Sequence, residues 1–76
     1  MNEKQLTVVT GPVYNPQVCQ VVLNGVQASE RLTPQLARRA VHVAAGFSFP
    51  ATVWDSENKY GYRVYAKSAR KITEEE

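Results

Sequence analysis

The chain has 76 residues, of which 43% are hydrophobic and 21% charged, and nine Lys and Arg against seven Asp and Glu give it a net charge of +2. A chain of this length forms one small domain that buries about 60% of its unfolded surface, which leaves no room for a deep catalytic cleft. The mild positive charge excludes an acidic mimic of DNA, and it is too small to indicate nucleic-acid binding by itself.

Cysteine content and hydropathy restrict the cellular compartment in which the protein is expected. Cys19 is the only cysteine, so no internal disulfide can form and a zinc site built on several thiolates is excluded. The first ten residues, MNEKQLTVVT, carry charge where a secretory signal has an apolar run. No apolar stretch reaches the roughly 20 residues that cross a bilayer. We therefore expect a cytoplasmic protein with no membrane partner.

The N-terminal half predicts three strands. Residues 6–10 (LTVVT) are short and rich in β-branched side chains, and the loop of residues 11–17 contains two prolines. Asn24 and Gly25 tolerate the positive φ values of a two-residue hairpin turn, so residues 18–23 and 26–30 are expected to pair as antiparallel strands.

A helix is predicted over residues 34–45. Thr33 is a suitable N-cap, Pro34 suits the first helical position, and Gly46 can end the helix in a left-handed conformation. An apolar stripe is expected to face the core, formed by Leu36, Ala37, Ala40, Val41, Val43 and Ala44. The opposite face carries Gln35, Arg38, Arg39 and His42, and this arc is either ordinary solvated surface or a basic contact face for a partner.

The C-terminal half predicts a second hairpin with a longer loop. Residues 51–54 form one strand and residues 60–67 (YGYRVYAK) return antiparallel to it. Alternation places Tyr62 and Val64 on the core side of the last strand and Arg63 on the other side. Residues 68–76 end in three glutamates and are expected to be a polar, solvated tail.

These elements predict an α+β fold of order βββαββ, in which one helix covers one face of an antiparallel sheet of four or five strands. Residues 1–67 would form the domain and residues 68–76 the tail. The second face of the sheet has nothing to cover it, so we expect it to bind a partner or a second copy of the chain. The predicted partner-binding residues are Trp54, Arg63, Tyr65 and Lys67 on this face, with Arg38 and Arg39 on the helix.

Catalytic patterns are missing from the sequence. The single histidine, His42, lies beside two arginines, and the acidic residues form no pair on a rigid frame. No glycine pattern that cradles a phosphate precedes the helix. We therefore expect no enzyme activity, no cofactor and no metal site.

Two functions remain open at this point. One is a protein-binding module, an inhibitor or adaptor that acts by surface contacts on a larger protein or complex. The other is a small nucleic-acid-binding module, in which the aromatic and basic sheet face would stack bases and contact phosphates.

The layout also resembles a group of known inhibitors. A chain of this size with Asn24-Gly25, then a capped helix from Thr33-Pro34 to Gly46, then a hairpin from Trp54 to Tyr65 is similar to anti-CRISPR proteins of phages and mobile elements. The resemblance implies a phage-encoded protein in the host cytoplasm that blocks a host defence nuclease or CRISPR complex through surface contacts. It implies no particular functional residues.

Overall fold

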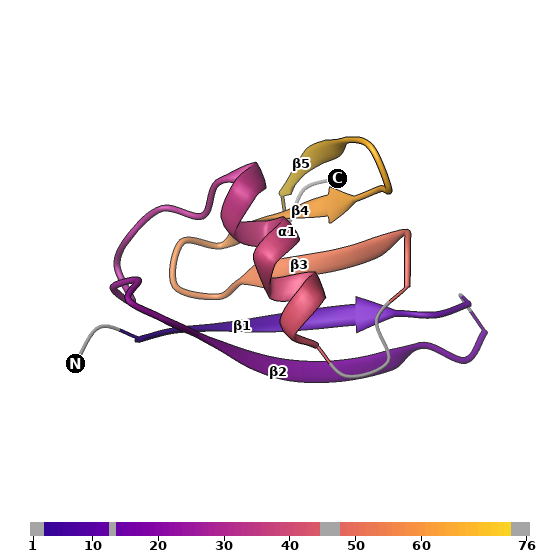
Figure 1. The fold of residues 1–76 in the computed structure, drawn as a ribbon, viewed down its shortest axis with the longest axis horizontal. Helices are drawn as coiled ribbons and strands as arrows, with labels where there is room; N and C mark the ends of the chain where they lie inside the picture. The colour runs from indigo at the N-terminus through magenta and orange to yellow at the C-terminus, as the bar shows by residue number, and fades with distance from the viewer. Residues whose placement is uncertain (1–2, 13, 45–47, 74–76) are drawn as a thin grey trace.

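The computed structural model describes residues 3–12, 14–44 and 48–73. One helix lies across one face of a five-stranded sheet, as Figure 1 shows. The elements, in chain order, are β1 (Glu3–Thr10), β2 (Gln17–Asn24), α1 (Pro34–Val43), β3 (Ala51–Asp55), β4 (Tyr60–Val64) and β5 (Ala69–Thr73). The predicted α+β fold with one helix on an antiparallel sheet is confirmed, with the order ββαβββ in place of βββαββ.

The strand order in the sheet is β2-β1-β3-β4-β5, and every neighbouring pair is antiparallel. β1 lies between β2 and β3, so the connection from β2 through α1 to β3 passes over β1 (Figure 1). β2 and β5 are the two edges. The strand of residues 6–10, which sequence alone could not pair, is therefore an interior strand that extends from Glu3 to Thr10.

The predicted hairpin at Asn24-Gly25 is wrong. Gly25 does take a positive φ of 84°, but residues 26–30 form no strand, and β2 pairs with β1 instead. Val26 and Leu32 are buried in the core, so the segment between them is anchored at both ends while its polar residues stay in solvent. Pairing with β1 aligns Leu6 with Val21 on the core side, which gives β2 a longer apolar partner than residues 26–30 offer.

The helix begins as predicted. Pro34 is at its start, and the hydroxyl oxygen of Thr33 accepts a hydrogen bond from the Leu36 amide at 3.2 Å. The helix ends at Val43, and the predicted end at Ala45 and Gly46 lies outside the described residues. Its buried face consists of Ala37, Ala40 and Val41, with Ala44 buried just after the helix and Leu36 half-buried. Val43 is 54% exposed, so its assignment to the core is wrong.

The core side of the sheet contains one buried ion pair. The side chains of Lys4 and Asp55 are 1% and 0% exposed, and Lys4 Nζ lies 3.0 Å from Asp55 Oδ2. Lys4 also donates to the carbonyl of Ala28 at 2.8 Å. Asp55 Oδ1 accepts from the amide of Glu57 at 3.0 Å, and Asp55 Oδ2 accepts from the side-chain amide of Asn58 at 3.0 Å. Each charge thus faces the other and has at least one further hydrogen-bond partner, which compensates for burial.

The predicted tail contains a strand. Ala69–Thr73 form β5 along β4, with Val64 opposite Ala69 and Tyr60 opposite Thr73. This corrects the expectation of a solvated tail for these residues, while Glu74, Glu75 and Glu76 lie outside the described residues. The strand predicted over residues 60–67 ends at Val64, because the amide of Tyr65 donates to the carbonyl of Ser68 at 2.7 Å and closes a turn.

No helix among the described residues is long and apolar enough to cross a membrane.

Candidate functional site: the open face of the sheet

The face of the sheet opposite α1, called the open face below, follows from the strand register. Side chains alternate along each strand, and residues directly opposite each other share a face. Because Ala51, Val53 and Asp55 are buried on the helix side, Thr52 and Trp54 belong to the open face. Register then adds the following residues to it: Glu3, Gln5, Thr7, Val9, Val18, Gln20, Val22, Asn24, Gly61, Arg63, Arg70 and Ile72.

Trp54 lies at the centre of this face, over Gly61. The two residues are directly opposite on β3 and β4, and a Cβ atom added to Gly61 would be 3.1 Å from Cε3 of the indole and would overlap the Val53 carbonyl oxygen. A side chain at position 61 would therefore displace the indole. Ile72 of β5 lies directly opposite Gly61, on the side of β4 away from Trp54. An uncharged band thus crosses the open face from Trp54 to Ile72.

Two arginines lie beside this band. Arg63 on β4 and Arg70 on β5 are directly opposite each other, and both are exposed. Arg63 makes a long hydrogen bond of 3.5 Å from Nη1 to Thr52 Oγ1. Within the described residues neither arginine has a carboxylate partner. Like charges placed directly opposite in a sheet destabilise the pairing, so this arrangement does not contribute to the stability of the fold.

Tyr65 and Lys67 belong to the turn that follows β4. The Arg63 guanidinium carbon is 6.0 Å from the centre of the Tyr65 ring, which places an aromatic ring next to Arg63. Lys67 is exposed in the same turn. The structure thus brings Arg63 and Tyr65 together and sets Trp54 diagonally across from Arg63. We call Trp54, Arg63, Tyr65, Arg70 and Ile72 the open-face cluster.

The helix arginines lie on the other side of the sheet. Arg38 donates to the carbonyls of Ala66 at 3.2 Å and Ser68 at 3.3 Å, and so ties α1 to the turn between β4 and β5. Arg39 donates to the carbonyl of Asn24 at 3.2 Å, at the end of β2. The structure therefore separates Arg38 and Arg39 from Trp54 and Arg63, whereas Arg38 contacts the turn that contains Tyr65 and Lys67.

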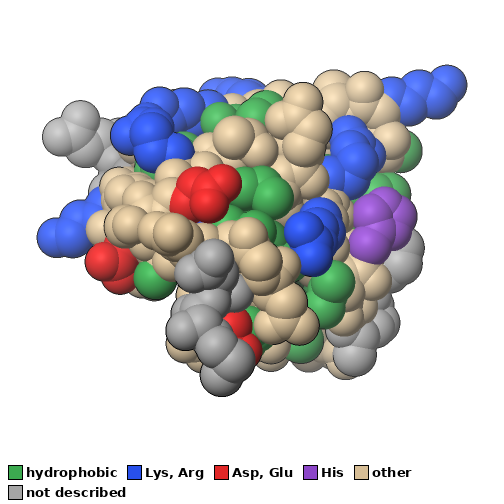
Figure 2. All heavy atoms as spheres, turned by 60° about the vertical axis from the view of Figure 1, so that its left-hand side comes forward, with side chains coloured by type: hydrophobic (Ala, Val, Ile, Leu, Met, Phe, Trp, Pro, Cys, Tyr) green, Lys and Arg blue, Asp and Glu red, His purple; other side chains and the backbone are tan. Residues whose placement is uncertain are grey.

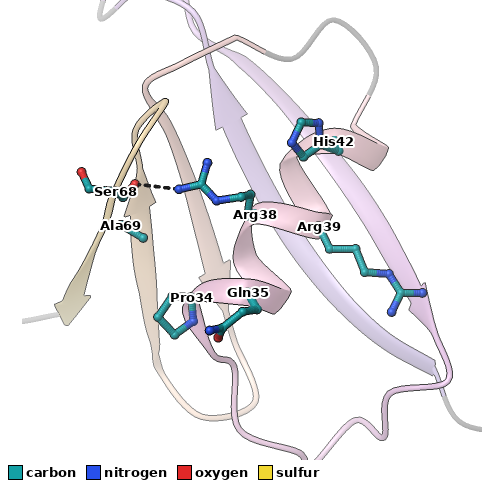
Figure 3. Close-up of a pocket in the computed structure, with 7 residues that line it drawn as sticks. All are labelled: Pro34, Gln35, Arg38, Arg39, His42, Ser68 and Ala69. Atoms are coloured by element: carbon teal, nitrogen blue, oxygen red, sulfur yellow. Dashed lines mark hydrogen bonds between the residues drawn. The ribbon is translucent and has the colours of Figure 1, made fainter.

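A shallow hollow of about 520 Å³ lies beside the helix, bounded by Pro34, Gln35, Arg38, Arg39, His42, Ser68 and Ala69. Figure 3 shows that the two guanidinium groups diverge, with Arg38 reaching toward Ser68 and Arg39 extending to the opposite side of the helix. An anion in the hollow would not meet convergent donors. The hollow is therefore a weaker candidate site than the open face.

Exposed charges are distributed unevenly. The three described glutamates, Glu3, Glu30 and Glu57, lie on β1 and in two loops, and those loops also carry Arg31 and Lys59. The other exposed or half-buried basic residues lie on α1, β4, β5 and the turn after β4: Arg38, Arg39, Arg63, Lys67, Arg70 and Lys71. On the side of the molecule seen in Figure 2, the blue Lys and Arg side chains are scattered and do not form one continuous patch. The basic character is thus local, and it is most concentrated where β4 and β5 pair.

Tyr60, on the covered side of the sheet, has a shifted pKa. Burial raises the pKa of Tyr60 above its usual value near 10.0, with the nearby Arg31 acting in the opposite direction. Its hydroxyl donates to the carbonyl of Leu32, and the guanidinium of Arg31 lies 5.1 Å from the ring centre. Tyr60 fastens the loop before α1 to β4, which is a structural role.

Sequence reasoning missed Arg70 and Ile72 as members of the open face, because both were assigned to the tail. The signal that could have found them is the turn-length segment Ala66-Lys67-Ser68 followed by ARKIT, in which Arg70 and Ile72 alternate with Ala69 and Lys71.

No group of His, Cys, Asp or Glu side chains that could hold a metal ion occurs in the part of the chain that the structure describes. No protein-family model matches the sequence, and no curated protein or solved structure is significantly similar to this chain.

Proposed function

We propose that this protein is a small protein-binding module, an inhibitor or adaptor, that docks its open face on a larger protein with an acidic surface. The observation that carries the proposal is the opposed pair Arg63 and Arg70, beside the uncharged band of Trp54 and Ile72. The open-face cluster contains Trp, Tyr and Arg, which dominate the binding energy of protein interfaces.

Two features favour a protein partner. First, a carboxylate of the partner placed between the two guanidinium groups would replace their mutual repulsion with two charge-assisted hydrogen bonds. Second, Ile72 and Val9 add aliphatic surface to the open face. Aliphatic side chains gain from apolar protein surface that a sugar-phosphate backbone does not offer. Blocking of a host defence nuclease or CRISPR complex is one form that such docking would take.

Nucleic-acid binding is the second candidate, favoured by Arg63, which lies 6.0 Å from the centre of the Tyr65 ring and diagonally across from Trp54. Exposed aromatic rings and guanidinium groups on an open sheet can stack successive bases. The net charge of only +2 gives this candidate less support.

The experiment is affinity capture from lysate with three forms of the full chain: wild type, Arg63→Ala/Arg70→Ala, and Arg38→Ala/Arg39→Ala. The two double variants remove the same charge from opposite sides of the sheet, so they separate the effect of location from that of charge. Each capture is done with and without nuclease, and unfolding in urea checks that both variants remain folded.

The proposal expects a stoichiometric protein that survives nuclease treatment, binds the helix variant, and is lost with the open-face variant. Loss with the helix variant alone would overturn the assignment of the surface and favour the hollow beside α1. Recovery of nucleic acid that decreases steeply as salt is raised would replace the protein partner with the second candidate.

A further inference from the structure

The two edges of the sheet differ in how they are protected. β5 is five residues long and carries Arg70 and Lys71, and short, charged strands resist pairing with another chain. β2 is eight residues long, has the sequence QVCQVVLN without a charged side chain, and pairs with β1 over eight consecutive residues without a bulge. No helix or strand of the described chain lies beyond β2 (Figure 1). Within residues 3–12, 14–44 and 48–73, its outer edge is thus covered by no helix or strand and carries no charged side chain.

Two aliphatic side chains mark this edge. Val18 is 64% exposed and Val22 is 44% exposed, on the same face of β2, with Gln20 between them. They are separated by four positions and lie symmetrically about Gln20. A strand with this pattern presents the same sequence of apolar, polar and apolar side chains when it is read in either direction.

The length of strand that can pair is bounded at both ends. Pro16 precedes β2 and has no amide hydrogen, so a ladder cannot continue through it. Asn24 ends β2, and its carbonyl already accepts the hydrogen bond from Arg39. The segment free to pair is therefore residues 17–23, and its midpoint is Gln20.

We infer that two copies of this chain associate by antiparallel pairing of β2 with β2 of the second copy, about a two-fold axis that passes through Gln20. Gln17 then lies opposite the partner's Leu23, so the ends of both segments coincide. Val18 lies opposite the partner's Val22, and Gln20 lies opposite the partner's Gln20. Each contact is self-complementary, because valine meets valine and an amide that can both donate and accept meets its own copy.

Other registers lose this match. Side chains keep their face only if the register shifts by two positions. A shift in one direction places Val18 opposite the partner's Gln20, and a shift in the other direction places it opposite the partner's Asn24. Either shift also carries one end of the ladder past Pro16 or Gly25. A second copy fits this edge better than an unrelated strand, since the absence of charge over residues 17–24 gives a foreign partner no charge to recognise. The inference does not depend on the proposed function.

The test uses sedimentation of the full chain over a range of concentrations, with Gln20→Lys and Gln20→Glu as variants. The Gln20 side chain is exposed, and its hydrogen bonds within the described part of the chain go to the side chains of exposed Gln5 and half-buried Thr7, so both variants should fold. We expect the wild type to reach twice the 8.5 kDa mass of one chain as concentration rises. In each variant, like charges meet across the axis and raise the dissociation constant about fivefold or more.

An equimolar mixture of the two variants is the decisive sample. Lysine then meets glutamate at the axis, so the mixture should dimerise at least as well as the wild type. Gln35→Lys, which adds the same charge to the exposed side of α1, is the control and should dimerise like the wild type. A wild type that stays at 8.5 kDa at every concentration overturns the inference. So does undiminished dimerisation of Gln20→Lys, or a mixture that remains monomeric.

Discussion

The two faces of the sheet differ in whether their positive charges have a counter-charge. On the covered face, Lys4 is 1% exposed and is compensated by Asp55 and by the carbonyl of Ala28. On the open face, Arg63 and Arg70 are exposed, directly opposite each other, and without a carboxylate among the described residues. Among the described residues, the buried positive charge thus has a counter-charge, and the two opposed arginines have none. The following predictions test this contrast, in order of decreasing effect.

Lys4→Met should have the largest effect. It leaves the Asp55 carboxylate buried without its counter-charge, which costs about 3–5 kcal/mol of unfolding free energy. Urea unfolding measures the loss. Adding Asp55→Asn removes the orphaned charge and keeps a side-chain oxygen for the Glu57 amide, so the double variant should regain part of the stability. A cost of Lys4→Met below about 1 kcal/mol would show that the ion pair is not tightly buried.

Gly61→Ala should come next, because a methyl group at position 61 would overlap the Val53 carbonyl and press on the Trp54 ring. We expect a loss of about 3 kcal/mol, the upper end for overpacked sites. Gly25→Ala is the control: it has open space around it and only its φ of 84° to oppose a side chain, so it should cost about 1 kcal/mol. Equal losses in thermal or urea unfolding would contradict the position of the indole over Gly61.

Tyr60→Phe should cost about 1 kcal/mol at neutral pH, since the buried carbonyl of Leu32 loses its donor. It should also change the response to alkali. The pKa of Tyr60 is raised in the folded state, so the unfolded chain releases this proton first, and the stability that Tyr60 contributes is lost as pH rises above about 10.

Urea unfolding at neutral pH and above pH 10 measures this response. The gap between wild type and Tyr60→Phe should narrow at the higher pH. A gap that widens there would mean that ionised Tyr60 is favoured by the fold, contrary to its burial.

Arg70→Glu should have the smallest effect on stability and the opposite sign. It turns the like-charged pair with Arg63 into an attractive one, which should stabilise the fold by about 0.5 kcal/mol. The same change should weaken capture of an acidic protein partner. Lys67→Glu, in the turn outside the ladder, is the matched charge change and should leave the unfolding free energy nearly unchanged. Destabilisation by Arg70→Glu would show that the two arginines are not opposed in solution.

Local signals predicted the parts of the fold that depend on neighbours in sequence. Thr33 and Pro34 marked the start of the helix, and the alternation in YGYRV separated Val64 from Arg63. What failed depends on distant partners. Asn24 and Gly25 are suitable turn residues, but which strand β2 pairs with is decided by the apolar side of β1. The chain therefore forms the β1–β2 hairpin, which has a long, proline-containing loop, and does not form the predicted hairpin with a two-residue turn.

The candidate site was predicted in part for the same reason. Arg63, Tyr65 and Trp54 alternate on strands that the pattern identified, so their common face could be inferred. Arg70 and Ile72 join them only because β5 pairs with β4, and a five-residue strand before three glutamates has little local signal. The burial of Lys4 had no local signal in the sequence, because its partner Asp55 is 51 positions away.

The position of β1 has a consequence for how the chain folds. Its contact with β3 joins Val8 to Val53, which are 45 positions apart, so the middle of the sheet is completed only after the helix and the crossover are available. Contacts of such long range slow folding relative to hairpins and helices, because the chain entropy is lost before the contacts form. During synthesis on a ribosome, β1 and β2 would emerge as an early hairpin with one edge of β1 unsatisfied. That edge is covered only when β3 arrives.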